Sequence, residues 1–175
     1  MQVNIGKILL TEDQIKNKVK ELGAKITNDY KDKKLLMISV LKGSVIFMSD
    51  LMRAVNLKMK IDFMSVSSYS GETKSTGVVK FLKDLDMDVK GYDVLIVEDI
   101  LDSGLTLNYL KNLLIQRSPK SIKIVTLLDK AERREIDIEA DYVGFKIPDE
   151  YIIGYGLDYR EEYRNLPYIG FLNIE

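Results

Sequence analysis

The chain has 175 residues, of which 46% are hydrophobic and 30% charged, the profile of a globular protein with a core of its own. It contains no cysteine and no histidine, which excludes disulfides, thiolate or imidazole metal sites, and catalysis by Ser-His or Cys-His pairs. Any bound metal would be a hard ion held by oxygen, and the net charge of -1 gives no reason to expect nucleic-acid or membrane binding.

The first predicted helix begins after Thr11, which can form a capping box with Gln14. Its apolar residues fall on one helical face, at Ile15, Val19, Leu22 and Ile26. The segment before it has no signal-peptide pattern, and no apolar run reaches membrane-spanning length. We therefore expect a cytoplasmic protein.

Strands and helices then alternate, which predicts an α/β fold of βαβ units around a mainly parallel sheet. Strands are expected at 35–41, from Ile61, at 78–82, 93–97 and 121–128, and briefly at 142–145 and 151–155. Helices are expected at 45–55 and 104–116, a polar loop at 70–77, and an irregular tail after 155.

The stretch "VLIVEDILDSGLTL" places Glu98, Asp99 and Asp102 after a predicted buried strand, at the sheet edge where such folds bind ligands. The following "DSGLT" offers backbone N–H groups and hydroxyls at a helix start, which suit a phosphate. Carboxylates beside a phosphate would repel it unless they face neutral hydroxyls or a metal ion. A sugar phosphate with Mg²⁺ meets these demands, whereas the alternative is a solvated loop with Asp102 as a helix cap.

The stretch lacks the nucleotide P-loop and Rossmann patterns. It closely resembles the phosphoribosyl-diphosphate signature of type I phosphoribosyltransferases. The segments "LKGS", "SSYSGETKSTG", "LLDK" and 142–170 resemble the bacterial hypoxanthine-guanine phosphoribosyltransferases. This resemblance implies one domain spanning 1–175, with a mainly parallel sheet and a small hood formed by the N-terminal and C-terminal segments. It also implies purine salvage, in which a phosphoribosyl group moves from phosphoribosyl diphosphate to N9 of a 6-oxopurine.

The resemblance also implies a sugar-phosphate site. Glu98 and Asp99 would hold the ribose hydroxyls and Mg²⁺. Lys42, Gly43 and Arg164 would bind the diphosphate, with a cis peptide at Leu41–Lys42. The 5-phosphate would bind mostly to backbone N–H groups of Ser103, Gly104, Leu105 and Thr106.

For the purine, the resemblance implies that Asp102 is the general base near N7 and that Lys130 donates to the 6-oxygen. Tyr151 would stack on the base, and the backbone of Ile152 would contact its edge. Asp158 would bind a second Mg²⁺ through water and lie near the exocyclic amine of guanine. Position alone favours a solvated lysine at Lys130 and a core aromatic residue at Tyr151.

Ser68 and Tyr69 would lie on a loop that closes over the site, although an ordinary exposed hairpin loop would have the same composition. Relatives imply a homodimer or homotetramer. Three alternatives stay open: a phosphoribosyltransferase that prefers xanthine, an RNA-binding regulator, which should show a basic face, and a receiver-type signalling domain with clustered acids.

Overall fold

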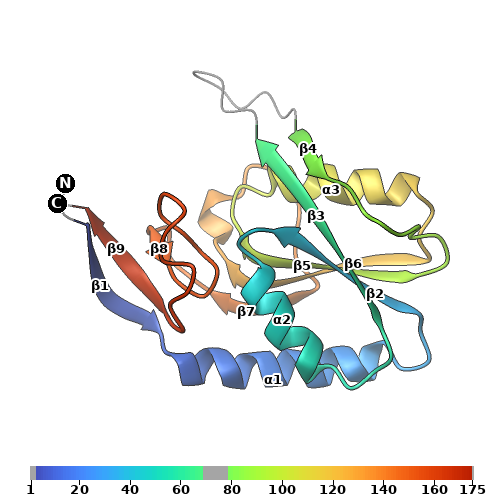
Figure 1. The fold of residues 1–175 in the computed structure, drawn as a ribbon, viewed down its shortest axis with the longest axis horizontal. Helices are drawn as coiled ribbons and strands as arrows, with labels where there is room; N and C mark the ends of the chain where they lie inside the picture. Colours follow the sequence, from blue (N-terminus) through green and yellow to red (C-terminus); the bar gives the residue numbers. More distant parts are fainter. Residues whose placement is uncertain (1–2, 69–78, 175) are drawn as a thin grey trace.

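The computed structural model describes residues 3–68 and 79–174, which form two sheets (Figure 1). Six strands form the larger sheet in the order β4-β3-β2-β5-β6-β7, and three form the smaller sheet in the order β1-β9-β8. The helices are α1 (Glu12–Asp29), α2 (Val45–Ala54) and α3 (Leu105–Gln116), with a short 3₁₀ helix η1 (Ala131–Arg133). The strands are β1 (Val3–Leu10), β2 (Leu35–Leu41), β3 (Lys60–Ser68), β4 (Val79–Lys83), β5 (Asp93–Leu101), β6 (Ser121–Asp129), β7 (Tyr142–Lys146), β8 (Ile152–Ile153) and β9 (Ile169–Ile174).

The larger sheet is mainly parallel, as the alternation of strands and helices predicts. The pairs β2·β3, β2·β5, β5·β6 and β6·β7 are parallel, and only β4 runs antiparallel to its neighbour. Every residue of β2 except the last is buried. Strands covered on both faces in this way read as continuous apolar runs in the sequence.

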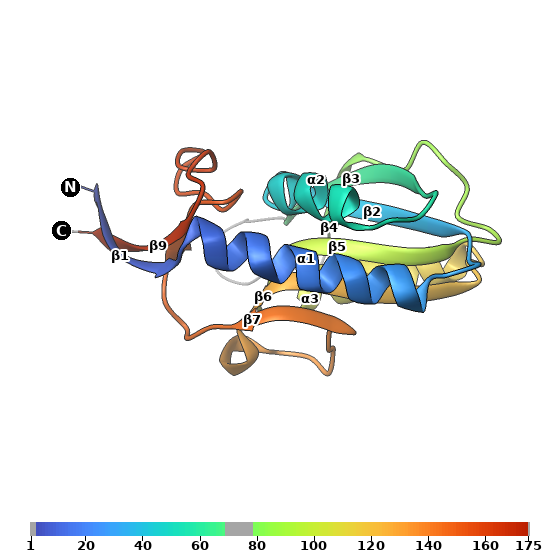
Figure 2. The same cartoon turned by 90° about the horizontal axis from the view of Figure 1, so that it is seen from below.

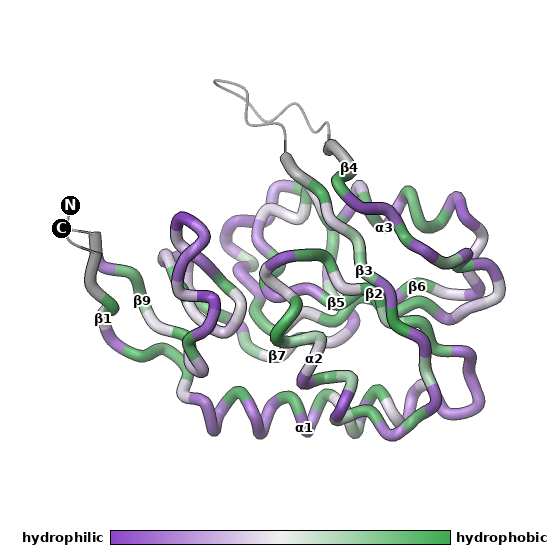
Figure 3. Tube along the Cα trace, in the orientation of Figure 1, coloured by the Kyte–Doolittle hydropathy of each residue, from purple (hydrophilic) through white to green (hydrophobic). Residues whose placement is uncertain are grey.

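The capping box at the start of α1 is confirmed. The N–H of Gln14 donates to Thr11 Oγ1 at 3.3 Å, and the N–H of Thr11 donates to Gln14 Oε1 at 2.8 Å. The predicted apolar face of α1 is buried at Ile15, Val19, Leu22 and Ile26. Figure 3 shows the resulting alternation of hydrophilic and hydrophobic residues along this helix.

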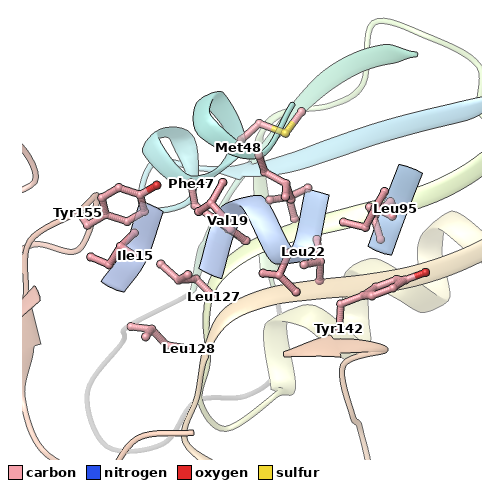
Figure 4. Packing of buried hydrophobic residues seen from close by; sticks show 14 of the residues in the cluster. Ile15, Val19, Leu22, Phe47, Met48, Leu95, Leu127, Leu128, Tyr142 and Tyr155 are labelled. Carbon is pink, nitrogen blue, oxygen red and sulfur yellow. The ribbon is translucent and has the colours of Figure 1, made fainter. Parts of the chain in front are cut away.

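The helices cover both faces of the sheet, and each face has its own apolar cluster. One cluster joins α1 and α2 to alternate residues of the central strands, such as Leu95 and Val97 of β5. The other joins α3 to the intervening residues, such as Val94 and Ile96. Figure 4 shows part of the first cluster, and in it Tyr155 lies near Ile15 of α1.

The smaller sheet brings the two ends of the chain together, and both termini lie at its outer end (Figure 2). β1 pairs antiparallel with β9, which also pairs with β8. The expectation of an irregular tail is therefore wrong for β9. Its pairing partner lies at the opposite end of the sequence, so the local pattern carried no sign of it.

β5 is longer than predicted, and this changes the setting of the acidic cluster. The strand continues past Val97 to Leu101, because β6 stays paired with it from Ser121 to Asp129. Glu98 and Asp99 therefore lie within the strand and not after it. Among the described residues, no helix is long and apolar enough to cross a membrane.

Candidate active site

The turn between β5 and α3 has the backbone of an anion-binding site. Gly104 has a φ of 84°, and a Cβ atom there would lie 2.5 Å from Ile138 Cγ2, so only glycine fits without rearrangement. Gly104 is the N-cap of α3, and its lack of a side chain leaves the helix start without a side-chain cap. Ser103 Oγ accepts from the N–H of Leu105 at 3.4 Å, and Thr106 follows in the first turn. The remaining N–H groups at a helix start have no partners within the helix and can bind a phosphate.

Asp102 is not the cap of α3, so the capping alternative is wrong. Its Oδ1 atom is buried and accepts no hydrogen bond among the described residues. The guanidinium Nε of Arg133 lies 3.5 Å away from that oxygen. The Asp102 side chain as a whole is 42% exposed and lines the cavity described below, so its carboxylate is accessible to a ligand there.

The segment that follows β6 is hydrogen-bonded to this turn. The guanidinium of Arg134 donates both to the backbone carbonyl of Asp102 and to the carboxylate of Asp129. The N–H of Glu135 donates to the carbonyl of Ser103 at 3.0 Å. The position of Asp102 and of the helix start is thereby fixed to the end of β6.

A cavity of about 200 Å³ opens beside Asp102. Five of its lining residues are site residues suggested by the sequence: Asp102, Lys130, Tyr151, Ile152 and Asp158. The others are Ile100, Arg133 and Leu157. Side chains from the end of the parallel sheet and from the segment leading into the smaller sheet thus meet around one space.

Lys130 and Tyr151 depart from the roles that position alone would suggest. The side chain of Lys130 is only 7% exposed, and its Nζ donates to the carbonyl of Glu150 at 2.7 Å, with Asp149 Oδ1 at 3.8 Å. Tyr151 is 56% exposed, so it is not a core aromatic residue. Its ring meets that of Tyr159 edge-on, with centroids 5.9 Å apart. The cavity is therefore lined by the Lys130 ammonium, which a hydrogen bond holds in place, and by the accessible ring of Tyr151.

Glu98 and Asp99 lie close to this region but do not line the cavity. Burial, together with the negative charge of Asp99, raises the pKa of Glu98 well above its usual value. Burial raises the pKa of Asp99 to about 6, while the Arg164 guanidinium opposes this and the Asp158 carboxylate adds to it. Since side chains alternate along a strand, the two carboxylates leave opposite faces of β5. The sequence did not show this separation.

The loop after β2 lies against Asp99. The peptide bond between Leu41 and Lys42 is cis, as the resemblance implied. A Cβ atom on Gly43 would lie 1.9 Å from Asp99 Oδ2, so the close approach of the carboxylate requires glycine. Ser68 ends β3, and Tyr69 lies outside the described residues.

Lys42 and Arg164 meet at the same side of the site. Lys42 Nζ donates to Glu161 Oε2 at 2.7 Å, and the Arg164 guanidinium lies 3.4 Å from the same oxygen. Arg164 also contacts Asp158 Oδ1 at 2.9 Å and donates to the carbonyl of Gly156 at 2.8 Å. The Lys42 ammonium lowers the pKa of Glu161, so this glutamate is ionised at neutral pH.

A divalent ion at this site would need a ligand to supply part of its coordination. The described residues contain no group of three acidic side chains arranged as a self-sufficient metal site. Mg²⁺ is commonly bound through one or two carboxylates plus substrate oxygens and water. Burial raises the pKa of both Glu98 and Asp99, and a bound cation would favour their ionised forms.

Two contacts at the site left no sign in the sequence: the hydrogen bond of Arg134 to the turn after β5, and the contact of Glu161 with Lys42 and Arg164. Arg134 and Glu161 stand in charged stretches, "AERRE" and "REEYR", that look like solvated surface. Arg133, Ile100 and Leu157 likewise carry no local signal. Only the fold shows that these residues face the site.

Comparison with known proteins supports one family. Residues 7–160 match the phosphoribosyl transferase domain family. The chain is 56% identical over 172 residues to the hypoxanthine-guanine phosphoribosyltransferase of Bacillus subtilis, covering 98% of this chain and 96% of that protein. It is 55% identical over 175 residues to its Staphylococcus epidermidis counterpart, covering all of this chain and 98% of that one.

Solved structures agree with these relatives. A hypoxanthine phosphoribosyltransferase from Staphylococcus aureus superposes with a TM-score of 0.94 at 56% identity, covering 97% of this chain and 92% of that one. A hypoxanthine-guanine phosphoribosyltransferase from Bacillus anthracis, solved with a HEPES molecule in its active site, gives 0.93 at 48% identity, covering 99% of this chain and all of that one.

Proposed function

The chain belongs to the phosphoribosyl transferase family, within its bacterial hypoxanthine-guanine group, and on that premise we propose that it catalyses purine salvage. It transfers the phosphoribosyl group of 5-phosphoribosyl 1-diphosphate to N9 of hypoxanthine and of guanine. The products are IMP or GMP and diphosphate. The observation that carries the proposal is the cavity that joins Asp102, Lys130 and Tyr151 beside the turn after β5.

A 6-oxopurine base matches the hydrogen-bonding and stacking groups of this cavity. Lys130 is a donor without acceptor capacity, and a 6-oxopurine presents a carbonyl acceptor at C6. Tyr151 offers an exposed ring face for stacking, which is worth about 1–3 kcal/mol per base in nucleic-acid proteins. The backbone of Ile152 contacts the edge of the base, and backbone near Asp158 accepts the exocyclic amine of guanine. Adenine would place an amine against Lys130 and leave two donors unpaired, at a cost of about 1–3 kcal/mol.

Asp102 acts as the general base. Its carboxylate, which lines the cavity, can accept the proton that N7 of the purine gives up as N9 bonds to the sugar. Its backbone is held by Arg134, so the carboxylate is positioned before substrate arrives. The 5-phosphate binds at the start of α3, to Ser103, Gly104, Leu105 and Thr106.

Departure of diphosphate leaves positive charge on the sugar carbon and negative charge on the leaving group, so catalysis depends on electrostatics and positioning. Lys42, the N–H of Gly43 and Arg164 stabilise the diphosphate. Of the two acids assigned to the ribose hydroxyls, Asp99 lies against Gly43 on the diphosphate side, where its charge would favour the developing cation. Glu98 leaves the opposite face of β5, and its role at the ribose is carried by the family resemblance alone. Glu98, Asp99 and Asp158 are the residues that would hold Mg²⁺, and the ion would supply positive charge to the leaving diphosphate.

Residues 1–175 work as one domain in this scheme. The cavity takes Lys130 from the end of the larger sheet and Ile152 from the smaller one, and a single apolar cluster includes residues of both. We infer a homodimer or homotetramer, as the family resemblance implies, and a cytoplasmic location, as the sequence pattern suggests. The similarity to named salvage enzymes favours this activity over an RNA-binding regulator or a receiver domain.

The test is an assay of nucleotide formation with phosphoribosyl diphosphate, Mg²⁺ and one base at a time. Hypoxanthine and guanine should yield IMP and GMP with release of diphosphate, and adenine should yield no product above background. Preferential use of xanthine would support the xanthine alternative. Failure with all four bases would contradict the proposed function.

A further inference from the structure

Glu161 contacts both cations that the proposed diphosphate site needs, and it shares Arg164 with Asp158, whose Oδ1 lies 2.9 Å from the guanidinium. The Oε2 atom of Glu161 accepts from Lys42 Nζ at 2.7 Å and lies 3.4 Å from the Arg164 guanidinium. The Lys42 contact joins residues that are far apart in the sequence and on different elements. A carboxylate oxygen bridging a lysine and an arginine is the same arrangement that a phosphate oxygen would adopt between them.

The backbone around Glu161 is arranged to present this side chain. Arg160 and Glu161 have φ values of 53° and 68°, in the left-handed region that non-glycine residues rarely adopt. The N–H of Glu161 donates to Asp158 Oδ2 at 2.9 Å, which fixes the turn. Strained backbone of this kind persists where the surroundings over-determine it, commonly at ligand sites.

The contact can also be released. The side chains of Lys42 and Glu161 are 66% and 65% exposed, and an ion pair at such exposure contributes little stability. Glu161 can therefore leave when a more strongly charged group arrives, without breaking packed structure. If it stays, its charge repels the incoming anion.

From this geometry we propose that Glu161 is an internal competitor for diphosphate, which weakens diphosphate binding at Lys42 and Arg164 and speeds its release. The inference rests on the proposed function, because it takes these two cations to be the diphosphate site. In that reaction the leaving group must depart before the next turnover, and product release limits many enzymes. A carboxylate that re-forms its ion pairs as the product leaves would favour this step.

The experiment measures inorganic diphosphate binding in the presence of Mg²⁺ by calorimetry, on the full chain with Glu161→Gln and the matched control Glu162→Gln. Both variants remove one exposed negative charge from the same turn, but only Glu161 bridges the two cations. Glu161→Gln should bind diphosphate about two- to fivefold more tightly than wild type, and the gain should shrink in about 1 M salt. Glu162→Gln should bind like wild type. Tighter binding is not an effect that structural damage produces.

A second binding measurement tests whether the gain in diphosphate affinity arises at Lys42. In a Lys42→Gln background, Glu161→Gln should give a smaller gain, because one of the two competing pairs is already absent. The inference would be overturned if Glu161→Gln bound diphosphate no more tightly than wild type, or if Glu162→Gln showed an equal gain. Nucleotide formation by the wild type would still support the proposed function in that case. A wild type that neither binds diphosphate nor forms nucleotide would overturn both.

Discussion

The Nζ atom of Lys130 donates a 2.7 Å hydrogen bond to the backbone carbonyl of Glu150, the residue immediately before Tyr151. This bond connects the end of β6 to the segment that carries the aromatic wall of the cavity. The ammonium is therefore held at the cavity wall and has further protons to donate. The donor and the ring are set relative to each other before a base binds.

Lys130→Gln should lower kcat/KM for hypoxanthine about 5- to 150-fold, because the 6-oxygen loses a charged donor worth about 1–3 kcal/mol. The exposed Lys90→Gln is the matched control and should keep wild-type kinetics. Steady-state assays at saturating phosphoribosyl diphosphate measure the effect. Full 6-oxopurine activity in Lys130→Gln would refute the assigned role.

Asp102→Asn should lower kcat by about 10²–10⁴, the usual contribution of general acid–base catalysis. Its thermal midpoint should stay near that of wild type, since the Asp102 side chain does not cap α3 and makes no hydrogen bond among the described residues. The exposed Asp88→Asn serves as control. If turnover held in Asp102→Asn, another group would have to be the base.

Arg134→Lys should lower kcat/KM for phosphoribosyl diphosphate about tenfold, because a lysine keeps the charge but cannot span the Asp102 carbonyl and the Asp129 carboxylate. Arg53→Lys, at a side chain that is 72% exposed, is the control. Kinetics together with a thermal melt separate positioning from stability. Wild-type kinetics in Arg134→Lys would show that these two contacts do not position the site.

The contribution of Asp99 to the stability of the ligand-free, metal-free protein should fall as the pH rises from about 4 to 6. The pKa of Asp99 is raised to about 6 in the folded state, so that state binds more protons than the unfolded state across this window. Asp99→Asn should therefore be more stable than wild type at pH 7, by at most about 3 kcal/mol, and equal to it near pH 4. Urea unfolding across this pH range measures the difference.

Asp84 provides a control of opposite sign for that experiment. The hydrogen bonds from Arg117 lower the pKa of Asp84, so its contribution is present at neutral pH and is lost as the pH falls through its folded pKa. Asp84→Asn should lower stability at pH 7. Equal behaviour of the two variants at all pH values would contradict the assignment for Asp99.

Local patterns were sufficient to predict the central fold. The capping residues of α1, the buried runs of β2 and β6 and the start of α3 each leave a signal within a few residues. The true end of β5 and the existence of β9 depend on strands elsewhere in the chain. Pairing with β6 extends β5 to Leu101, and pairing with β1 forms β9.

For the candidate site too, local features could be predicted from the sequence and contacts between distant segments could not. The turn at Gly104 and the acids before it belong to one stretch, which made their chemistry readable from the sequence. The meeting of Lys42 with Glu161, and of Arg134 with Asp102, is created by the fold alone. Charged residues of this kind look like solvated surface until their neighbours are known.

The most direct test of the account is a crystal structure of the protein with IMP and Mg²⁺-diphosphate. The account predicts hypoxanthine in the cavity against Tyr151, with Lys130 Nζ within hydrogen-bond distance of the 6-oxygen and Asp102 within that distance of N7. The 5′-phosphate should lie on the N–H groups of residues 103–106. A base bound outside this cavity, or a phosphate away from that turn, would contradict it.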